Sequence, residues 1–133
     1  MSKETANKSV MLVEDEDSIA IALRFLLERE GYEVSRVADG KSAIEEIKRR
    51  APDLVLLDVM LPGASGYEVC QSIRLNSALD DVKIMMITAR ASATERRKGL
   101  ALGADAFLGK PFSNTEVKAE ARRLLSEKAL GDD

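Results

Sequence analysis

The chain has 133 residues, of which 45% are hydrophobic and 32% charged, a balance typical of one globular domain with an ordinary core. Its formal net charge of −3 argues against binding of nucleic acid or an anionic membrane through bulk charge. One cysteine and no histidine exclude an internal disulfide, a cysteine-cluster zinc site and a histidine general base.

No apolar run approaches the ~18 residues of a membrane span, and the N-terminal residues MSKETANK lack the apolar segment of a signal peptide. We therefore expect a cytoplasmic protein that does not contact a membrane. The sequence has no repeat, low-complexity stretch or linker, so residues 1–133 are expected to form a single domain. Its core is expected at about 9–128, with frayed ends and no output domain.

Short apolar runs alternate with amphipathic stretches, a pattern typical of strands followed by helices. The runs predict strands at residues 10–13, 32–37, 54–57, 82–88 and 104–108. The first helix is expected between Asp17, its N-cap, and Gly31, its stop. The later helices are expected at residues 41–50, 65–76, 91–102 and 114–129.

The spacing of apolar residues also predicts which helical side chains face the core. They are Ile19, Ala22, Leu23, Leu26 and Leu27 in the first helix, Ala43, Ile44 and Ile47 in the second, Val69 and Ile73 in the third, and Val117, Ala121, Leu124 and Leu125 in the fifth. The fourth helix has few large apolar residues and an internal Gly99, so we expect it to be among the less stable elements.

The predicted strands are of two kinds. The first, third and fourth are continuously apolar, as expected for strands buried on both faces. The second alternates polar and apolar residues, and the fifth contains Asp105 and ends at Gly109, so these two are expected at the edges. The pattern predicts an α/β fold, a doubly wound five-stranded parallel sheet in the flavodoxin-like order 2-1-3-4-5.

Acidic side chains follow two of the central strands. Glu14 and Asp15 come after the first strand, and Asp58 comes after the third. In such a sheet, ligands bind outside the carboxyl ends of the strands where the strand order reverses, here between these two strands. Three converging carboxylates repel one another unless a cation lies among them. All-oxygen ligation suits Mg²⁺, which we expect as the cofactor.

Two further polar residues stand at strand ends. Thr88 ends the fourth strand, and Lys110 follows the fifth. A carboxylate beside Mg²⁺ can attack a phosphoryl group and form an aspartyl-phosphate. The Lys110 ammonium and the Thr88 hydroxyl have the chemistry to bind the phosphoryl oxygens. A phosphohistidine donor has a good leaving group, so this reaction requires no general base.

These residues lie in four stretches, VMLVEDE, LVLLDVMLPGASGYE, IMMITAR and GADAFLGKPF. In this order and spacing they resemble the motifs of the receiver domains of two-component response regulators, over residues 10–125. The resemblance implies that Asp58 accepts phosphate from a histidine kinase or a histidine phosphotransfer protein. It implies a signalling module that is not an enzyme toward other substrates, because it catalyses only its own phosphorylation and slow autodephosphorylation.

The resemblance also implies how Mg²⁺ is bound. Asp15 is the expected direct ligand, and Glu14 is expected to act largely through water. Asp58 and the backbone carbonyl of Met60 complete the expected protein ligands.

The resemblance implies a switch as well. Thr88 is the expected switch hydroxyl, and Lys110, joined to Pro111 by a cis peptide bond, the expected phosphate contact. As Thr88 turns toward the phosphoryl group, an aromatic side chain fills the space behind it, and Phe107 holds that position. Most members have Tyr or His there, and a static core aromatic remains an equal interpretation of Phe107. The downstream protein target is expected on the face formed by the fourth helix, fifth strand and fifth helix.

The sequence departs from the family pattern in places. The motifs most resemble receivers attached to winged-helix transcription factors, which dimerise through charged pairs on the face just named. Ala106 and Glu120 replace an Asp and an Arg of those pairs, and Asp105 loses its expected network. We therefore expect a monomer or weak dimer. Gly109 replaces a larger residue and is expected to loosen the approach to Lys110.

Other interpretations compete with this one. The chain is alternatively a phosphate-independent interaction module on the receiver fold, with residues 14–17 a solvated turn. A flavin carrier would have a hydroxyl-rich loop after the first strand, and a haloacid-type phosphohydrolase would have Asp in place of Met60. We expect Cys70 to be a core residue and residues 96–98 to form a solvated helix face.

Overall fold

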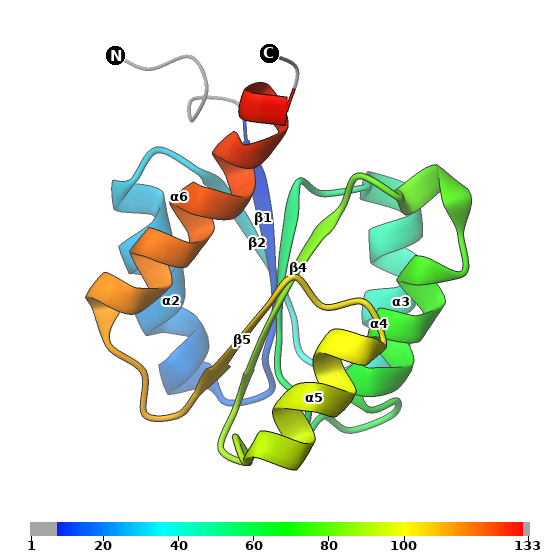
Figure 1. Cartoon of the computed structure of the whole chain (residues 1–133). Helices are drawn as coiled ribbons and strands as arrows, with labels where there is room; N and C mark the ends of the chain where they lie inside the picture. Colours follow the sequence, from blue (N-terminus) through cyan, green and yellow to red (C-terminus); the bar gives the residue numbers. More distant parts are fainter. Residues whose placement is uncertain (1–7, 132–133) are drawn as a thin grey trace.

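A computed structural model describes residues 8–131, with side chains described as far as residue 126. The prediction that both ends are frayed concerns mainly residues outside this range. Within it, five parallel strands form one sheet in the order β2-β1-β3-β4-β5, which confirms the predicted topology (Figure 1). The strands are β1 (Ser9–Val13), β2 (Glu33–Val37), β3 (Leu54–Leu57), β4 (Lys83–Thr88) and β5 (Ala106–Gly109).

Helices cover both faces of the sheet. They are α2 (Asp17–Arg29), α3 (Gly40–Arg50), α4 (Gly66–Arg74), α5 (Ala93–Ala101) and α6 (Asn114–Gly131), with a short 3₁₀ helix η1 (Ser77–Leu79) before β4. Figure 1 shows α2 and α6 on one face and α3, α4 and α5 on the other. None of the helices in the described residues is both long enough and apolar enough to cross a membrane.

Alternation along the central strands produces two cores. In β1, Val10 and Leu12 pack under α2 and α6, whereas Met11 and Val13 pack on the opposite face. The same alternation holds in β3 and β4, because successive side chains of a strand point to opposite faces. A strand buried on both faces has no polar position, which explains the continuously apolar runs in the sequence.

Most of the predicted inward positions are confirmed. Val69, Ile73, Val117 and Ala121 are each at most 1% exposed. Cys70 is also buried, and burial raises the pKa of its thiol to about 11, so the expected core role is confirmed.

The first helix differs from its prediction in two respects. Ala20, rather than Ala22, is buried beside Leu23. The predicted N-cap was also wrong, because Glu16 occupies that place and Asp17 is the first helical residue. The Asp17 carboxylate lies 2.9 Å from Nη1 of Arg36 on β2, so it serves a tertiary ion pair instead of capping the helix.

The fifth strand begins later than predicted. Residues 104 and 105 lie outside it. The Asp105 carboxylate accepts hydrogen bonds from Nη2 of Arg74 and from the backbone N–H of Ile84. The third helix is also shorter than its predicted range and ends at Arg74. Through its hydrogen bonds with Arg74 and Ile84, Asp105 connects α4 to the start of β4.

The fourth predicted helix is weakly anchored by apolar contacts. Gly99 is its one buried residue among those described in α5, and an added Cβ there would lie 2.9 Å from Cδ2 of Phe107. Polar contacts hold α5 instead, since Arg96 donates to the backbone oxygen of Phe107 at 2.9 Å and the Lys98 ammonium lies 4.3 Å from the centre of the Tyr67 ring. Arg96, Arg97 and Lys98 are nevertheless all exposed, so the expected solvated face at residues 96–98 is confirmed.

Candidate functional site

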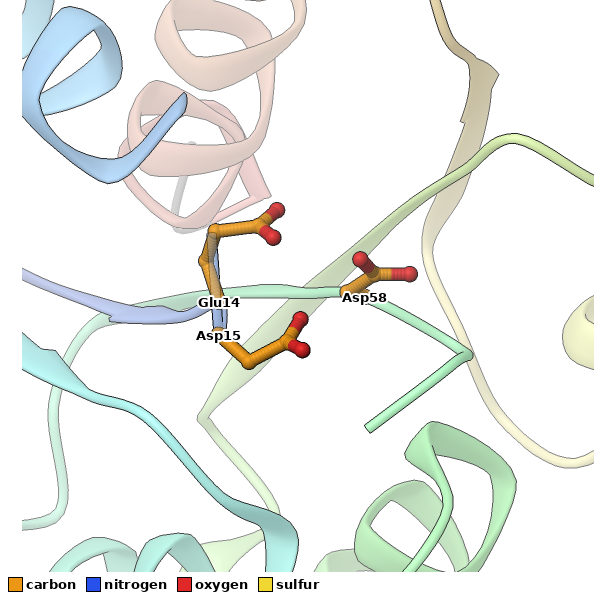
Figure 2. A group of neighbouring side chains, drawn as sticks. All are labelled: Glu14, Asp15 and Asp58. Carbon is orange, nitrogen blue, oxygen red and sulfur yellow. The ribbon is translucent and has the colours of Figure 1, made fainter. Parts of the chain in front are cut away.

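The carboxyl ends of β1 and β3 bring the acidic residues together. Val13 and Leu57 are paired in the parallel ladder, so Glu14 and Asp58 leave the sheet side by side. In the described part of the chain, ligand oxygens of Glu14, Asp15 and Asp58 all lie within 4.8 Å of one another. Figure 2 shows the three side chains around a common space beyond the strand ends.

The three acids differ in burial. Glu14 is 4% and Asp58 6% exposed, whereas Asp15 is open to solvent. Burial raises the pKa of Glu14, the negative charge of Asp58 adds to the rise, and a hydrogen bond from Lys110 opposes it. The site therefore confines negative charge that requires a positive partner.

Lys110 supplies part of that positive charge. Its ammonium lies 2.8 Å from Oδ2 of Asp58, 3.0 Å from Oε1 of Glu14 and 3.6 Å from Oε1 of Glu16. Burial lowers the pKa of Lys110, but its hydrogen bonds to Asp58 and Glu14 outweigh this effect, so the net pKa lies above its ordinary value. The peptide bond to Pro111 is cis, as expected.

The other oxygen of Asp58 is held by the following turn. The backbone N–H of Met60 donates to Oδ1 at 3.0 Å. The turn passes close to the start of α4, where an added Cβ on Gly66 would lie 2.3 Å from the backbone oxygen of Asp58. Glycine is therefore required at position 66 for this backbone path. The side chain of Met60 points to solvent and is 54% exposed.

Thr88 and Phe107 lie on the neighbouring strands β4 and β5. Thr88 is fully buried at the end of β4, and its hydroxyl oxygen accepts a hydrogen bond from the backbone N–H of Arg90 at 3.1 Å. Phe107 is 3% exposed and packs on the α5 side of the sheet. Gly109 pairs with Thr88, and an added Cβ there would lie 2.8 Å from Cβ of Ala91, so the small residue fits a tight contact.

One residue of the site region was missed by the sequence interpretation. Arg36 on β2 donates from Nε to the backbone oxygen of Glu14 at 2.9 Å and pairs through Nη1 with Asp17. The only signal in the sequence was a charged residue in the alternating edge strand, and no motif distinguished it from a surface position.

The donor set fits a hard divalent cation. The oxygens within reach are carboxylates, which Mg²⁺ prefers over nitrogen and sulfur ligands. One lysine offsets only part of the charge of the clustered acids, so a doubly charged ion would complete the neutralisation.

Residues 10–122 match the family model of the response regulator receiver domain. The chain belongs to this family. RegX3 of Mycolicibacterium smegmatis, a sensory transduction protein, is 47% identical over 125 residues, which cover 94% of this chain and 54% of that protein. PhoB of Rhizobium meliloti, a phosphate regulon transcriptional regulatory protein, is 42% identical over 87% of this chain and 51% of its own length.

This receiver domain thus spans about half the length of the curated relatives that it matches. Solved receivers share its fold. A putative response regulator from Chloroflexus aurantiacus is 32% identical, with a TM-score of 0.86 over 90% of this chain and 98% of that one. The receiver domain of the Pseudomonas aeruginosa sensor histidine kinase PA1611, solved with a magnesium ion in its active-site cleft, is 31% identical, with a TM-score of 0.83 over 91% and 99% of the two chains.

Proposed function

We propose that this receiver domain is a phosphorylation-dependent switch that accepts a phosphoryl group on Asp58 from a phosphohistidine of a histidine kinase or histidine phosphotransfer protein. The observation that carries the proposal is the meeting of Glu14, Asp15 and Asp58 at one point, with the Lys110 ammonium in contact with Asp58. A solvated turn at residues 14–17 would not bury the Glu14 carboxylate beside a lysine.

The residues divide the work of phosphoryl transfer. An Asp58 oxygen attacks phosphorus, the new O–P bond replaces the P–N bond, and the electron pair of that bond leaves with the histidine nitrogen. Lys110 exchanges its contact with Asp58 for an equatorial phosphoryl oxygen, and the Met60 N–H continues to orient the carboxyl group. Slow loss of the phosphoryl group to water would reset the switch.

We propose that Glu14, Asp15, Asp58 and the backbone carbonyl of Met60 hold the Mg²⁺ ion. When bound, the ion would offset the charge of the carboxylates and of the transferring phosphoryl group. Asp15 is the solvent-exposed member of the three acids, which suits a ligand that an ion reaches first from solution.

Thr88 would then respond to phosphorylation by donating a hydrogen bond to the phosphoryl group. Its hydroxyl oxygen accepts from Arg90 in this structure, and its proton is available to a phosphoryl oxygen placed on Asp58. Phe107 has no hydroxyl group, so its movement would be controlled by packing against Gly99 and Met86 rather than by a hydrogen bond. The switch side chains proposed here are Thr88 and Phe107.

The proposed target surface is the face formed by α5, β5 and α6. A cavity of about 480 Å³ lies on it, lined by residues that include Arg96, Phe107, Glu116, Glu120 and Arg123. Positive and negative side chains are mixed on this lining, which suits a protein partner rather than nucleic acid. The net charge of −3 over the 133 residues also argues against a nucleic-acid partner. We further propose a cytoplasmic location and a monomer or weak dimer, since Glu120 pairs with Arg123 of its own helix.

Mass spectrometry tests the phosphorylation. Incubation with Mg²⁺ and acetyl phosphate or phosphoramidate should add about 80 Da, one phosphoryl group, to the wild type. Asp58→Asn should abolish the gain, whereas Asp80→Asn, which changes an exposed carboxylate away from the site, should retain it. A wild type that stays unmodified would favour the phosphate-independent interaction module.

A further inference from the structure

We propose that Arg36 is a positioning residue of the acidic site, which holds the turn between β1 and α2 so that Glu14 and Asp15 present their carboxylates to a divalent cation. The inference rests on the proposed function, because it assigns a role toward the same ion. It concerns a side chain on an edge strand that is not itself a ligand.

The contacts of Arg36 bracket Asp15. Nε donates to the backbone oxygen of Glu14 at 2.9 Å, and Nη1 lies 2.9 Å from Oδ1 of Asp17. One guanidinium therefore holds the turn on both sides of Asp15. A planar fork can do this because its donors point in fixed, different directions.

The two acids of the turn depend on this support to different degrees. The Glu14 carboxylate is held directly, by Lys110 and by the backbone N–H of Glu16 at 3.1 Å. Among the described residues, no hydrogen bond or ion pair to the Asp15 carboxylate is found. The direction of Asp15 is consequently determined by the backbone of the turn, which is the part that Arg36 holds.

The strand register explains why Arg36 reaches the turn. β2 pairs with β1, Arg36 lies beside Leu12, and the backbone N–H of Glu14 donates to the oxygen of Val37 at 3.1 Å. β2 thus holds Glu14 from both sides, through the N–H by its backbone and through the carbonyl by Arg36. The Arg36 side chain is 24% exposed, so solvent only partly competes for these bonds.

The third nitrogen of the guanidinium supports a fixed orientation. Nη2 is buried and has no hydrogen-bond acceptor among the described residues. A side chain free to choose its orientation would not bury an unpaired donor, because that arrangement is unfavourable. The orientation is therefore imposed by the bonds at Nε and Nη1.

A purely electrostatic role of Arg36 and a positioning role predict opposite changes in the affinity for Mg²⁺ when Arg36 is replaced. If Arg36 acted only as a nearby positive charge, its removal would strengthen the binding of Mg²⁺, because like charges repel. If it acts by holding the turn, replacement by lysine, which keeps the charge but loses the fork, will weaken binding.

The experiment is a titration of the full chain with Mg²⁺, followed by calorimetry or by amide NMR, on wild type, Arg36→Lys and Arg36→Met. We expect Arg36→Lys to raise the Kd for Mg²⁺ by about tenfold, at the lower end of the range for groups that orient metal ligands. Arg24 is a matched control, since it also donates to a carbonyl of β2, that of Val34 at 2.7 Å, but does not touch the acidic turn. Arg24→Lys and Arg24→Met should leave the Kd nearly unchanged.

Two further readouts separate positioning from a general structural effect. The Mg²⁺ concentration that gives half the maximal rate of phosphorylation by acetyl phosphate should rise in Arg36→Lys in step with its Kd, whereas that of Arg24→Lys should match the wild type. In the metal-free protein, the amides of residues 14–17 should exchange hydrogen faster in Arg36→Lys, whereas those of α6 should not. These readouts apply even if Arg36→Met does not fold.

The outcomes are distinct. A Kd for Arg36→Lys equal to that of the wild type, or tighter binding by Arg36→Met, would overturn the positioning role while leaving the proposed function intact. A wild type with no affinity for Mg²⁺ would overturn the proposed function, and this inference with it.

Discussion

At the scale of single residues, the site buries two carboxylates close to one ammonium group. Glu14 and Asp58 are both buried, and they share the ammonium of Lys110. The pKa of Glu14 is nevertheless raised, chiefly by burial, so its charge is tolerated at a cost in stability. Binding chemistry and folding stability are therefore opposed at this position.

This cost has a definite pH dependence. A carboxyl group whose pKa is raised by folding destabilises the native state only when it is ionised, so the penalty develops as the pH rises above the ordinary value of 4.5. Glu14→Gln should raise the free energy of unfolding of the metal-free protein by roughly 1 kcal/mol at pH 7, the usual size for a single substitution. The glutamine oxygen can still accept from Lys110.

Urea denaturation in the presence of a chelator, at pH 7 and pH 4, measures this effect. The stabilisation should disappear at pH 4, because Glu14 is then protonated in the wild type as well. Glu16→Gln is the control, since Glu16 is exposed and the change should have little effect. A destabilised Glu14→Gln at pH 7 would show that the ion pair with Lys110 outweighs the cost of burial.

At the scale of elements, α5 is distinguished by how little apolar surface it buries. Its contacts with the rest of the fold are largely polar, including a hydrogen bond from the Tyr67 hydroxyl to the Glu95 carboxylate. Burial and this carboxylate raise the pKa of Tyr67 to about 12, so the hydroxyl remains a donor at neutral pH. An element held by few polar contacts can adopt a second arrangement at low cost, which suits the proposed target surface.

Gly99→Ala tests how α5 is seated. Alanine is the better helix former by about 1 kcal/mol, yet its Cβ would lie 2.8 Å from Sδ of Met86 and 2.9 Å from Cδ2 of Phe107. We expect the overlap to prevail and the protein to lose about 1–3 kcal/mol of stability, as in other overpacked cores. Chemical denaturation measures the change.

The neighbouring Arg97→Ala serves as the control, because Arg97 is exposed on the same helix. It should change stability by less than about 0.5 kcal/mol. A Gly99→Ala protein that is more stable than the wild type would mean that α5 moves away from Phe107 without cost.

At the scale of the whole molecule, the site joins strands that lie far apart in the sequence. Glu14 follows β1, Asp58 follows β3 and Lys110 follows β5, so the bonds of Lys110 to the two carboxylates link the centre and the edge of the sheet. A ligand that binds only the folded state stabilises that state as a whole.

Addition of Mg²⁺ should therefore raise the unfolding temperature of the entire domain. At a concentration of about 100 times its Kd, the expected gain is about 2.7 kcal/mol in the free energy of unfolding. Asp15→Asn should lose most of the gain, since it removes an expected ligand. Calorimetry with NaCl at equal ionic strength is the control, and an equal gain with NaCl would contradict specific binding.

Much of the architecture follows from the sequence alone. The continuously apolar runs of β1, β3 and β4 identify them as central strands, because only a strand covered on both faces has no polar position. The alternating pattern of β2 and the acidic residue before β5 identify the edges. Since the carboxyl ends of parallel strands share one edge of the sheet, this order also predicts that Glu14, Asp15 and Asp58 meet.

The tertiary structure alone decided features that depend on partners distant in the sequence. Asp17 is bound by Arg36 rather than by its own helix, and Asp105 is bound by Arg74 rather than placed in β5. Local patterns record the period of burial but not which charged groups meet across elements. The support of the acidic turn by Arg36 is of this second kind, because it arises only when β2 lies beside β1.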